Sequence, residues 1–277
     1  MSVIQSERAA RFRALHDGPG AFVIPNPWDV GSARILAGLG FQALATSSSA
    51  SANALGRRDG GLTLDEALAH ARSIVDATDL PVSADLEKGF GDAPEVVAET
   101  IRLAAGVGLV GCTIEDATGN PDSPLYDTGL AVERIAAAAQ AARALPFPFV
   151  LTARVHNLLY AAPSLNDTIS RLQSFEEAGA DVLFAPGLPD LAAVRAVCAA
   201  VSKPVNFMVG IKGNPGRRDH HQRLHPFPSC RVRTAARPGR AERPYHQPPF
   251  RPPLRNRSNE LPSFLIISRW RIPHAAT

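Results

Sequence analysis

The sequence has no long hydrophobic run and few cysteines. None of its 277 residues lies in a stretch of the ~18–20 apolar residues that a transmembrane helix needs, which disfavours a membrane protein. The N-terminal segment carries charges where a secretion signal needs an apolar centre, so export is not expected. The three cysteines are widely spaced and predict neither a metal pattern nor a disulfide framework, which points to the reducing cytoplasm. No G-x-G-x-x-G motif opens the first helix, which disfavours a dinucleotide-binding fold.

Charge is distributed unevenly along the chain. Residues 213–277 contain 13 arginines, no lysine, only three acids and 11 of the 24 prolines, and carry a net charge of +10. The whole chain carries +3, so residues 1–212 carry −7. We therefore expect two parts, an acidic folded body (1–212) and a basic tail of low order (213–277), in which frequent proline opposes helices and central strands.

The body alternates between short apolar runs and segments with helical periodicity. Near-continuous apolar strands that alternate with helices are typical of a parallel sheet covered on both faces. Thr63 and Glu66 form a T-x-x-E capping box, which predicts where one helix begins. The expected strands are residues 21–24, 43–46, 81–84, 111–114, 149–153, 181–185 and 205–209. The expected helices are residues 64–77, 93–105, 131–144, 165–178 and 191–201.

Polar residues recur at the carboxyl ends of the expected strands. They are Asn26, Ser47, Asp85, Glu115 and Arg154. A (β/α)₈ barrel places its chemistry at these ends, whereas a doubly wound sheet concentrates polar residues near one switch point. We therefore predict an α/β fold of the (β/α)₈ TIM-barrel type. The barrel is expected to be incomplete, because seven strands are recognisable and no regular eighth strand and helix follow Lys212.

Four acidic residues are expected to meet at the mouth of this barrel. Asp85 and Glu87 lie two residues apart at a strand end, so both side chains can face the same side. Glu115 ends the next strand, and Asp59 lies in the loop after the second strand. Carboxylates this close repel one another unless a proton or a cation lies between them. Such oxygen ligands suit Mg²⁺ or Mn²⁺ rather than zinc, although each acid taken singly could be a solvated residue at a loop start.

Two further groups at the predicted mouth have both a binding and a structural interpretation. The guanidinium of Arg154 can hold a substrate carboxylate or phosphonate, or it can form a structural ion pair with Glu115 or a neighbouring acid. Ser47 and Ser48 lie in a turn of small residues, whose backbone N–H groups can bind a substrate oxygen. As bare patterns, serine runs are common in loops, so this second indication is weak.

Three other residues are expected to be mainly structural. Asn206 lies in the last apolar run, where a buried amide needs a partner, and it is either a structural amide or a substrate contact. His156 is expected to be a packed histidine rather than a base. Cys112 lies inside a strand and is expected to be a small core residue.

Several short motifs recur in a fixed order along the body. They are Asn26-Pro27-Trp28-Asp29, Ser32-Ala33-Arg34, Thr46-Ser47-Ser48, Leu55-Gly56-Arg57-Arg58-Asp59, Asp85-Leu86-Glu87-Lys88-Gly89-Phe90-Gly91, Ile114-Glu115-Asp116 and Ala153-Arg154. In order and spacing, these motifs resemble the isocitrate lyase / phosphoenolpyruvate mutase superfamily over about residues 5–212. Members of that family are (β/α)₈ barrels that bind Mg²⁺ and cleave or form C–C or P–C bonds next to a 2-oxo acid.

The resemblance implies a role for each candidate residue. Asp85 would bind the metal most directly, and Glu87 takes the place of the family's second aspartate. The full set of implied metal ligands is Asp85, Glu87, Asp59 and Glu115, the last two through water. The implied substrate ligands are Ser47, Ser48, Arg154 and Asn206, and the implied catalytic residues are Arg154 and Glu115.

The loop after the fourth strand departs from the best-known branches of the family. Isocitrate and methylisocitrate lyases carry a lysine–cysteine–glycine–histidine motif there, whereas residues 117–127 contain no Cys, Lys or His. The chain looks most similar to the carboxyvinyl-carboxyphosphonate phosphorylmutase-like branch. We therefore expect a Mg²⁺-dependent lyase that acts on a small 2-oxo or 2-hydroxy carboxylate through an enolate. A phosphonopyruvate-type hydrolase or mutase that breaks a P–C bond is the alternative.

The tail has two interpretations. Its abrupt change to Arg, Pro and His at residue 213 favours a frameshifted end of a GC-rich gene, and with it an inactive, truncated homologue. The rival interpretation is an arm that binds nucleic acid through its charge. Without a regular eighth strand the barrel has an open edge. Either Ser263–Ile272 substitutes for that strand or the chain is poorly folded, and we expect the second. Family members assemble as homo-oligomers through their C-terminal helices, so such assembly is in doubt here.

Overall fold

The computed structural model describes residues 3–160, 164–209 and 265–268. Its strands are β1 (Phe22–Pro25), β2 (Leu44–Ala45), β3 (Val82–Asp85), β4 (Gly111–Glu115), β5 (Val150–Arg154), β6 (Val182–Phe184), β7 (Val205–Val209) and β8 (Leu265–Ser268). Its helices are α1 (Val3–Asp17), α2 (Val30–Gly38), α3 (Ser48–Ala54), α4 (Leu64–Ala77), α5 (Pro94–Gly106), α6 (Thr128–Arg143), the 3₁₀ helix η1 (Asn157–Leu159), α7 (Leu165–Glu177) and α8 (Leu191–Ala200).

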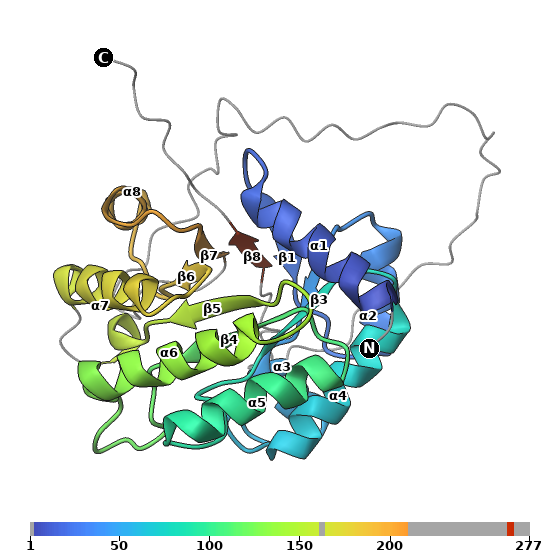
Figure 1. Ribbon diagram of the computed structural model, residues 1–277, viewed down its shortest axis with the longest axis horizontal. Helices are drawn as coiled ribbons and strands as arrows, with labels where there is room; N and C mark the ends of the chain where they lie inside the picture. Colours follow the sequence, from blue (N-terminus) through green and yellow to red (C-terminus); the bar gives the residue numbers. More distant parts are fainter. Residues whose placement is uncertain (1–2, 161–163, 210–264, 269–277) are drawn as a thin grey trace, which may run out of the picture. The chain divides into compact units, whose positions relative to one another are not determined.

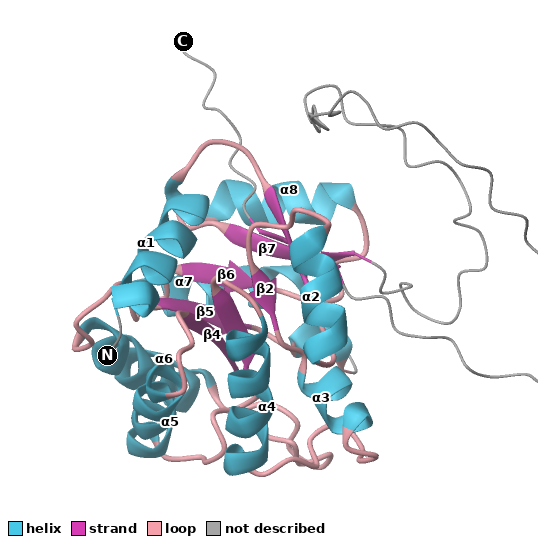
Figure 2. Cartoon of the chain, turned by 90° about the vertical axis from the view of Figure 1, so that its right-hand side faces the viewer, coloured by secondary structure: helices cyan, strands magenta, loops and turns pink. Residues whose placement is uncertain are grey.

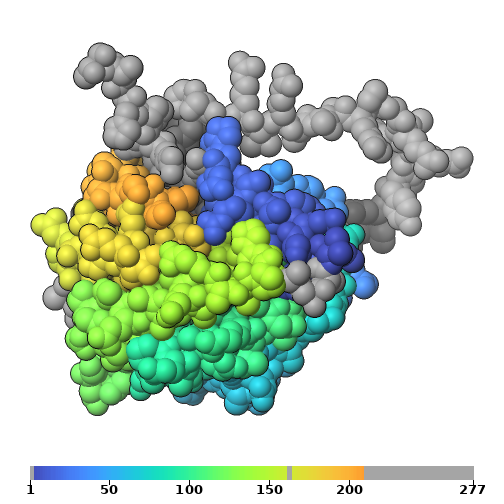
Figure 3. All heavy atoms as spheres, viewed as in Figure 1, coloured from blue at the N-terminus to red at the C-terminus, as the bar shows by residue number. Residues whose placement is uncertain are grey.

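The strands form one curled sheet of the incomplete barrel type that the sequence predicts. The strand order is β1-β8-β7-β6-β5-β4-β3-β2, and all pairings from β2 to β7 are parallel. The helices lie around the strands (Figure 2), and α5 and α6 lie side by side on the face shown in Figure 3. β1 and β2 are at the two ends of this order, and the Asn26 side-chain amide links them by donating to Ala45 O at 2.8 Å.

The place of the eighth barrel strand is taken by part of the apolar run in the tail. β8 pairs antiparallel with both β7 and β1 (Figure 1), whereas a regular barrel has eight parallel strands. The expected open edge between the seventh and first strands is therefore occupied, although by a strand of the opposite direction. The rest of the tail and the predicted boundary at residues 212–213 lie outside the described residues.

The helices begin where local signals place them. The predicted capping box is present, with Thr63 Oγ1 accepting from Glu66 N and the Glu66 carboxylate accepting from Thr63 N. Asp29 and Ser32 form a second capping box at α2, and Pro94 lies in the first turn of α5. These contacts satisfy N–H groups that the helix itself leaves unpaired.

Helix α1 lies across the amino-terminal ends of the strands. Its Gln5 amide donates to Leu109 O, which precedes β4, and its Arg13 contacts Asp181, which precedes β6. Phe12 of the same helix packs so close to Gly111 that a Cβ there would lie 2.9 Å from the ring and 2.8 Å from Val150 O. Only glycine fits at the start of β4, because α1 closes this end of the barrel.

His16 on α1 makes the stability of the fold sensitive to acid. Its ring lies edge-on to Phe12 and Phe22, with centroids 4.6 and 5.0 Å away, and its Nδ1 lies 2.9 Å from Phe12 O. Burial lowers the pKa of His16 from 6.5 to about 4. Between about pH 4 and pH 6.5, His16 is therefore protonated in the unfolded chain and neutral in the folded chain.

We expect the free energy of unfolding to fall by at most about 3 kcal/mol as the pH drops from 6.5 to 4. The loss is absent above pH 6.5, where His16 is neutral in both states. The substitution His16→Phe is expected to remove this part of the pH dependence. Urea unfolding of both proteins at several pH values checks it, because the contributions of the carboxylates cancel in the difference. An identical slope for the two proteins would show that His16 is not the titrating group.

Candidate active site

The side chains of the predicted mouth come from the last residues of three neighbouring strands. Asp85 ends β3, Glu115 ends β4 and Arg154 ends β5. Glu115 and Arg154 are direct partners in the β4–β5 register, and Asp85 pairs with Thr113, two residues before Glu115. Because parallel strands in register project alternate residues to the same side, all three side chains lie on the inner face of the sheet.

Arg154 joins the two carboxylates. Its Nη1 lies 3.4 Å from Asp85 Oδ2 and 3.5 Å from Glu115 Oε2, and the three side chains are only 13–14% exposed. Its guanidinium carbon also lies 5.1 Å from the ring centroid of Phe184, the next residue in the same register. Arg154 thus makes the ion pair with Glu115 that its structural interpretation expects, and its role in substrate binding stays a prediction. The guanidinium of Arg154 therefore faces the carboxylates of Asp85 and Glu115. Its Nε is buried and has no hydrogen-bond partner among the described residues.

Asp85 is held by the start of α3. Its Oδ2 accepts hydrogen bonds from Ser48 N at 3.3 Å and Ser48 Oγ at 3.1 Å, and its Oδ1 accepts from Glu87 N at 3.1 Å. Ser47 caps α3, with its Oγ accepting from Ala50 N at 3.4 Å. The expected serine turn is therefore wrong in form, because residues from Ser48 onward are helical. The donors of Ser48 point at Asp85 and order that carboxylate.

Glu115 has a third neighbour in His156. His156 Nε2 lies 2.9 Å from Glu115 Oε2, and its backbone N–H donates to Asp116 at 2.8 Å. Burial would raise the pKa of Glu115, but the contact with His156 and the positive charge of Arg154 outweigh it and hold the pKa below its usual value. Glu115 is therefore an ionised carboxylate in a buried place. His156 is only 8% exposed, as expected of a packed histidine, and it faces the site directly.

Glu87 has a pKa that is raised by its surroundings at the mouth. Burial, followed by the charges of Asp85, Asp59 and Glu115, raises the pKa of Glu87 to about 7. Its backbone has a positive φ of 50°, and its carbonyl accepts from Glu115 N at 3.0 Å. Asp59 contributes its charge from an exposed position in the loop after α3.

The donor chemistry of these four acids fits a hard divalent cation. Each offers only carboxylate oxygens, and their mutual repulsion, seen at Glu87, is what a cation would relieve. Within the residues that the structure describes, no three Asp, Glu, His or Cys side chains already surround a common point.

Asn206 lies in the same register one strand beyond Phe184. It is 5% exposed, and its Oδ1 has no hydrogen-bond partner among the described residues. A buried amide oxygen without a partner is rare in a folded protein, because its desolvation is not compensated. Its position keeps the prediction of a substrate contact open.

The sequence analysis missed several residues that support the site. Arg134 is 1% exposed and contacts the loop after β3, and Tyr126 lies beneath it. Asp116 is 2% exposed and accepts from both His156 N and Arg171 Nη1. The available signal was the position of Arg134, which shares a helix face with the buried Ala131 and Ala138.

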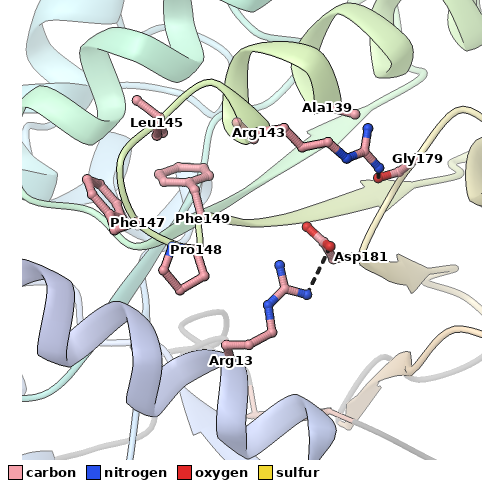
Figure 4. Close-up of a pocket in the computed structure, with 10 residues that line it drawn as sticks. Arg13, Ala139, Arg143, Leu145, Phe147, Pro148, Phe149, Gly179 and Asp181 are labelled. Atoms are coloured by element: carbon pink, nitrogen blue, oxygen red, sulfur yellow. Dashed lines mark hydrogen bonds and ion pairs between the residues drawn. The ribbon is translucent and has the colours of Figure 1, made fainter.

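A separate cavity of about 430 Å³ lies near the opposite ends of β5 and β6 (Figure 4). Its walls include Phe147, Phe149 and two arginines. Arg13 is paired with Asp181 at 2.9 Å, and Arg143 donates to Gly179 O at 3.1 Å. Both arginines of this cavity therefore already have a partner within the protein.

The fold and the mouth together define an α/β-barrel protein with a buried carboxylate–arginine cluster at the ends of its strands. Residues 12–225 match the family described as phosphoenolpyruvate phosphomutase. The chain therefore belongs to this family, within the phosphoenolpyruvate mutase / isocitrate lyase superfamily that its motifs resemble. No helix among the described residues is long and apolar enough to cross a membrane.

Its relatives include enzymes of more than one named activity. The chain is 35% identical to the 2-methylisocitrate lyase of Escherichia coli (strain K12) over 174 residues, which are 60% of this chain and 57% of that protein. It is 32% identical to the oxaloacetate decarboxylase of Ectopseudomonas mendocina (strain ymp) over 225 residues, 79% of this chain and 74% of the relative. A crystal structure of 2,3-dimethylmalate lyase is 30% identical, with a TM-score of 0.66 over 74% of this chain and 72% of the other. The chain thus spans less than two thirds of the E. coli relative.

Proposed function

We propose that this protein is a Mg²⁺-dependent lyase that cleaves or forms a C–C bond next to a small 2-oxo or 2-hydroxy carboxylate. The observation that carries the proposal is the cluster of Arg154 between Asp85 and Glu115, on the inner face at the ends of three parallel strands. A guanidinium next to carboxylates in a buried mouth can bind an anionic substrate, while the carboxylates hold a metal ion beside it. The names of the relatives, which specify small carboxylic acids, support the same substrate class.

Each residue has a role in this proposal. Asp85 would hold the ion directly, because Ser48 and the backbone N–H of Glu87 already fix its carboxylate. Glu87 would be the second acid of the site, and Asp59 and Glu115 would act through bound water. A Mg²⁺ or Mn²⁺ ion there would supply positive charge next to the substrate oxygen on which an enolate develops.

The substrate would be held by the guanidinium of Arg154 and the side-chain amide of Asn206. Arg154 would bind a substrate carboxylate through its guanidinium, whose Nε has no partner among the described residues. Asn206 would offer its amide to a second polar group. Neither Cys112 nor Cys198 is proposed as the acid, since both side chains are packed in the hydrophobic core.

A panel of acids tests the proposed reaction. The chain is incubated with 2-methylisocitrate, oxaloacetate, 2,3-dimethylmalate and phosphonopyruvate, with Mg²⁺ or with EDTA, and release of pyruvate or another 2-oxo acid is measured. We expect release from at least one carboxylic acid, lost in EDTA and restored by excess Mg²⁺. Phosphate release from phosphonopyruvate alone would instead favour P–C bond hydrolysis.

The same panel is run on a chimaera in which the family's usual C-terminal segment replaces residues 213–277. Activity confined to the chimaera would show that the site is present and that the tail limits it. No activity of either protein on any of the acids would contradict the lyase proposal.

A further inference from the structure

Arg134 is a buried cation whose hydrogen bonds all go to one loop. It projects from α6 and is 1% exposed. Its Nη1 donates to Gly91 O at 2.7 Å and also to Asp92 O, and its Nη2 donates to Lys88 O. These carbonyls belong to the loop between β3 and α5, which begins just after Asp85. A planar guanidinium can satisfy several acceptors in a fixed geometry, which a flexible ammonium cannot.

A second set of contacts holds Arg134 and the same loop together. The guanidinium carbon lies 4.2 Å from the ring centroid of Tyr126, and the Tyr126 hydroxyl donates to Asp92 Oδ1 at 2.5 Å. Lys88 Nζ pairs with the same Asp92 oxygen at 2.8 Å. Tyr126 lies at the end of the loop after β4, so two loops of the barrel mouth meet at Arg134.

The loop has a backbone that needs such support. Glu87 and Phe90 both have positive backbone φ angles, of 50° and 60°, which residues other than glycine rarely adopt. The carbonyl of Gly89 between them accepts from Thr100 Oγ1 at 2.9 Å. Such a conformation persists only when its surroundings fix it, and Arg134 supplies three of the hydrogen bonds that do so.

We propose that Arg134 is a positioning residue: it fixes the β3–α5 loop and thereby places the carboxylates of Glu87 and Asp85 for the cation. Glu87 N donates to Asp85 Oδ1, so a shift of the loop moves the partner of Asp85 as well as Glu87 itself. Arg134 does not touch the acids and acts only through the backbone. The effect of Arg134 on metal binding rests on the proposed function, whereas its effect on the conformation of the loop does not.

The substitution Arg134→Lys tests the inference while keeping the charge and the helix. Arg143→Lys is the matched control, because Arg143 is on the same helix, is exposed and bonds Gly179 O instead. Hydrogen exchange of peptides covering residues 86–92 is measured by mass spectrometry in the full-length proteins. Mg²⁺ affinity is measured by calorimetry without substrate. We expect Arg134→Lys to speed exchange in these peptides and to weaken Mg²⁺ binding, each about tenfold, with no change in Arg143→Lys.

Tyr126→Phe is the second variant if Arg134→Lys does not fold. It removes the hydroxyl contact with Asp92 and leaves a ring beneath Arg134, so a smaller increase in exchange of the same peptides is expected. Unchanged exchange at residues 86–92 in a folded variant would overturn the inference. Faster exchange with unchanged Mg²⁺ affinity would overturn the link to the carboxylates. If the unaltered chain binds no Mg²⁺, the proposed function fails, and the exchange data alone decide the role of Arg134.

Discussion

Replacing Asp85 with asparagine is expected to lower kcat/KM for the preferred acid about a thousandfold. Asparagine keeps the size of the side chain but lacks the negative charge that would bind the divalent metal ion. Stabilisation of developing oxyanion charge by a bound metal is worth several kcal/mol, and each 1.4 kcal/mol corresponds to about a tenfold change in rate. Because Arg154 keeps Glu115 as its ion-pair partner in this variant, most of the effect should fall on catalysis.

Steady-state kinetics at increasing Mg²⁺ concentrations measures the effect of Asp85→Asn. We expect the Mg²⁺ concentration for half-maximal rate to rise, with only partial recovery at saturation. Asp76→Asn is the control, because Asp76 is an exposed acid of α4 paired with Arg72 and lies in no part of the site. Kinetics like those of the unaltered protein in the Asp85 variant would remove this carboxylate from the metal site.

The second large effect is expected at Arg154. Arg154→Met leaves Asp85 and Glu115 buried without their shared cation, and removing one partner from a buried ion pair costs about 3–5 kcal/mol. We expect kcat/KM to fall by about a thousandfold and the melting temperature to fall as well. Arg154→Lys keeps the charge but loses the planar fork, so a smaller loss, about ten- to a hundredfold, should appear mainly as a higher KM.

Arg102→Met is the control for Arg154, because Arg102 is an exposed arginine of α5 paired with Glu99. Kinetics and thermal unfolding are measured together, so that lost stability can be separated from lost substrate binding. A lysine variant with the same KM as the unaltered protein would mean that Arg154 is only a structural partner of the acids.

Most elements of the fold were predictable because their signals are local, although α1, α2 and α3 were not among the expected helices. A capping box such as Thr63 with Glu66 joins residues three apart, and an apolar run such as Val205–Val209 needs no distant partner to be recognised. The barrel type was predictable for a related reason, since parallel strands bring their carboxyl ends together at one place. The convergence of Asp85, Glu115 and Arg154 follows from that topology alone.

The parts that the sequence did not reveal depend on distant contacts. Ser48 begins a short helix because its donors and the cap at Ser47 are satisfied there, and its partner Asp85 lies 37 residues away. The position of Arg134 on the helix face of buried alanines could indicate burial, but not its partners, because its acceptors lie 42–46 residues earlier in the chain. The direction of β8 is likewise set by pairing with β7 and β1, which no local pattern reports.

We propose that the carboxylates and Arg154 bind a divalent cation and a small 2-oxo or 2-hydroxy carboxylate together. A crystal of the protein with Mn²⁺ and oxalate tests it directly, because Mn²⁺ gives an anomalous signal and oxalate resembles a 2-oxo acid enolate. We predict an anomalous peak roughly 2.0–2.4 Å from an Asp85 carboxylate oxygen, with oxalate bound to the ion and within hydrogen-bond distance of Arg154. A mouth without the ion at saturating Mn²⁺, or oxalate bound only elsewhere, would contradict this account.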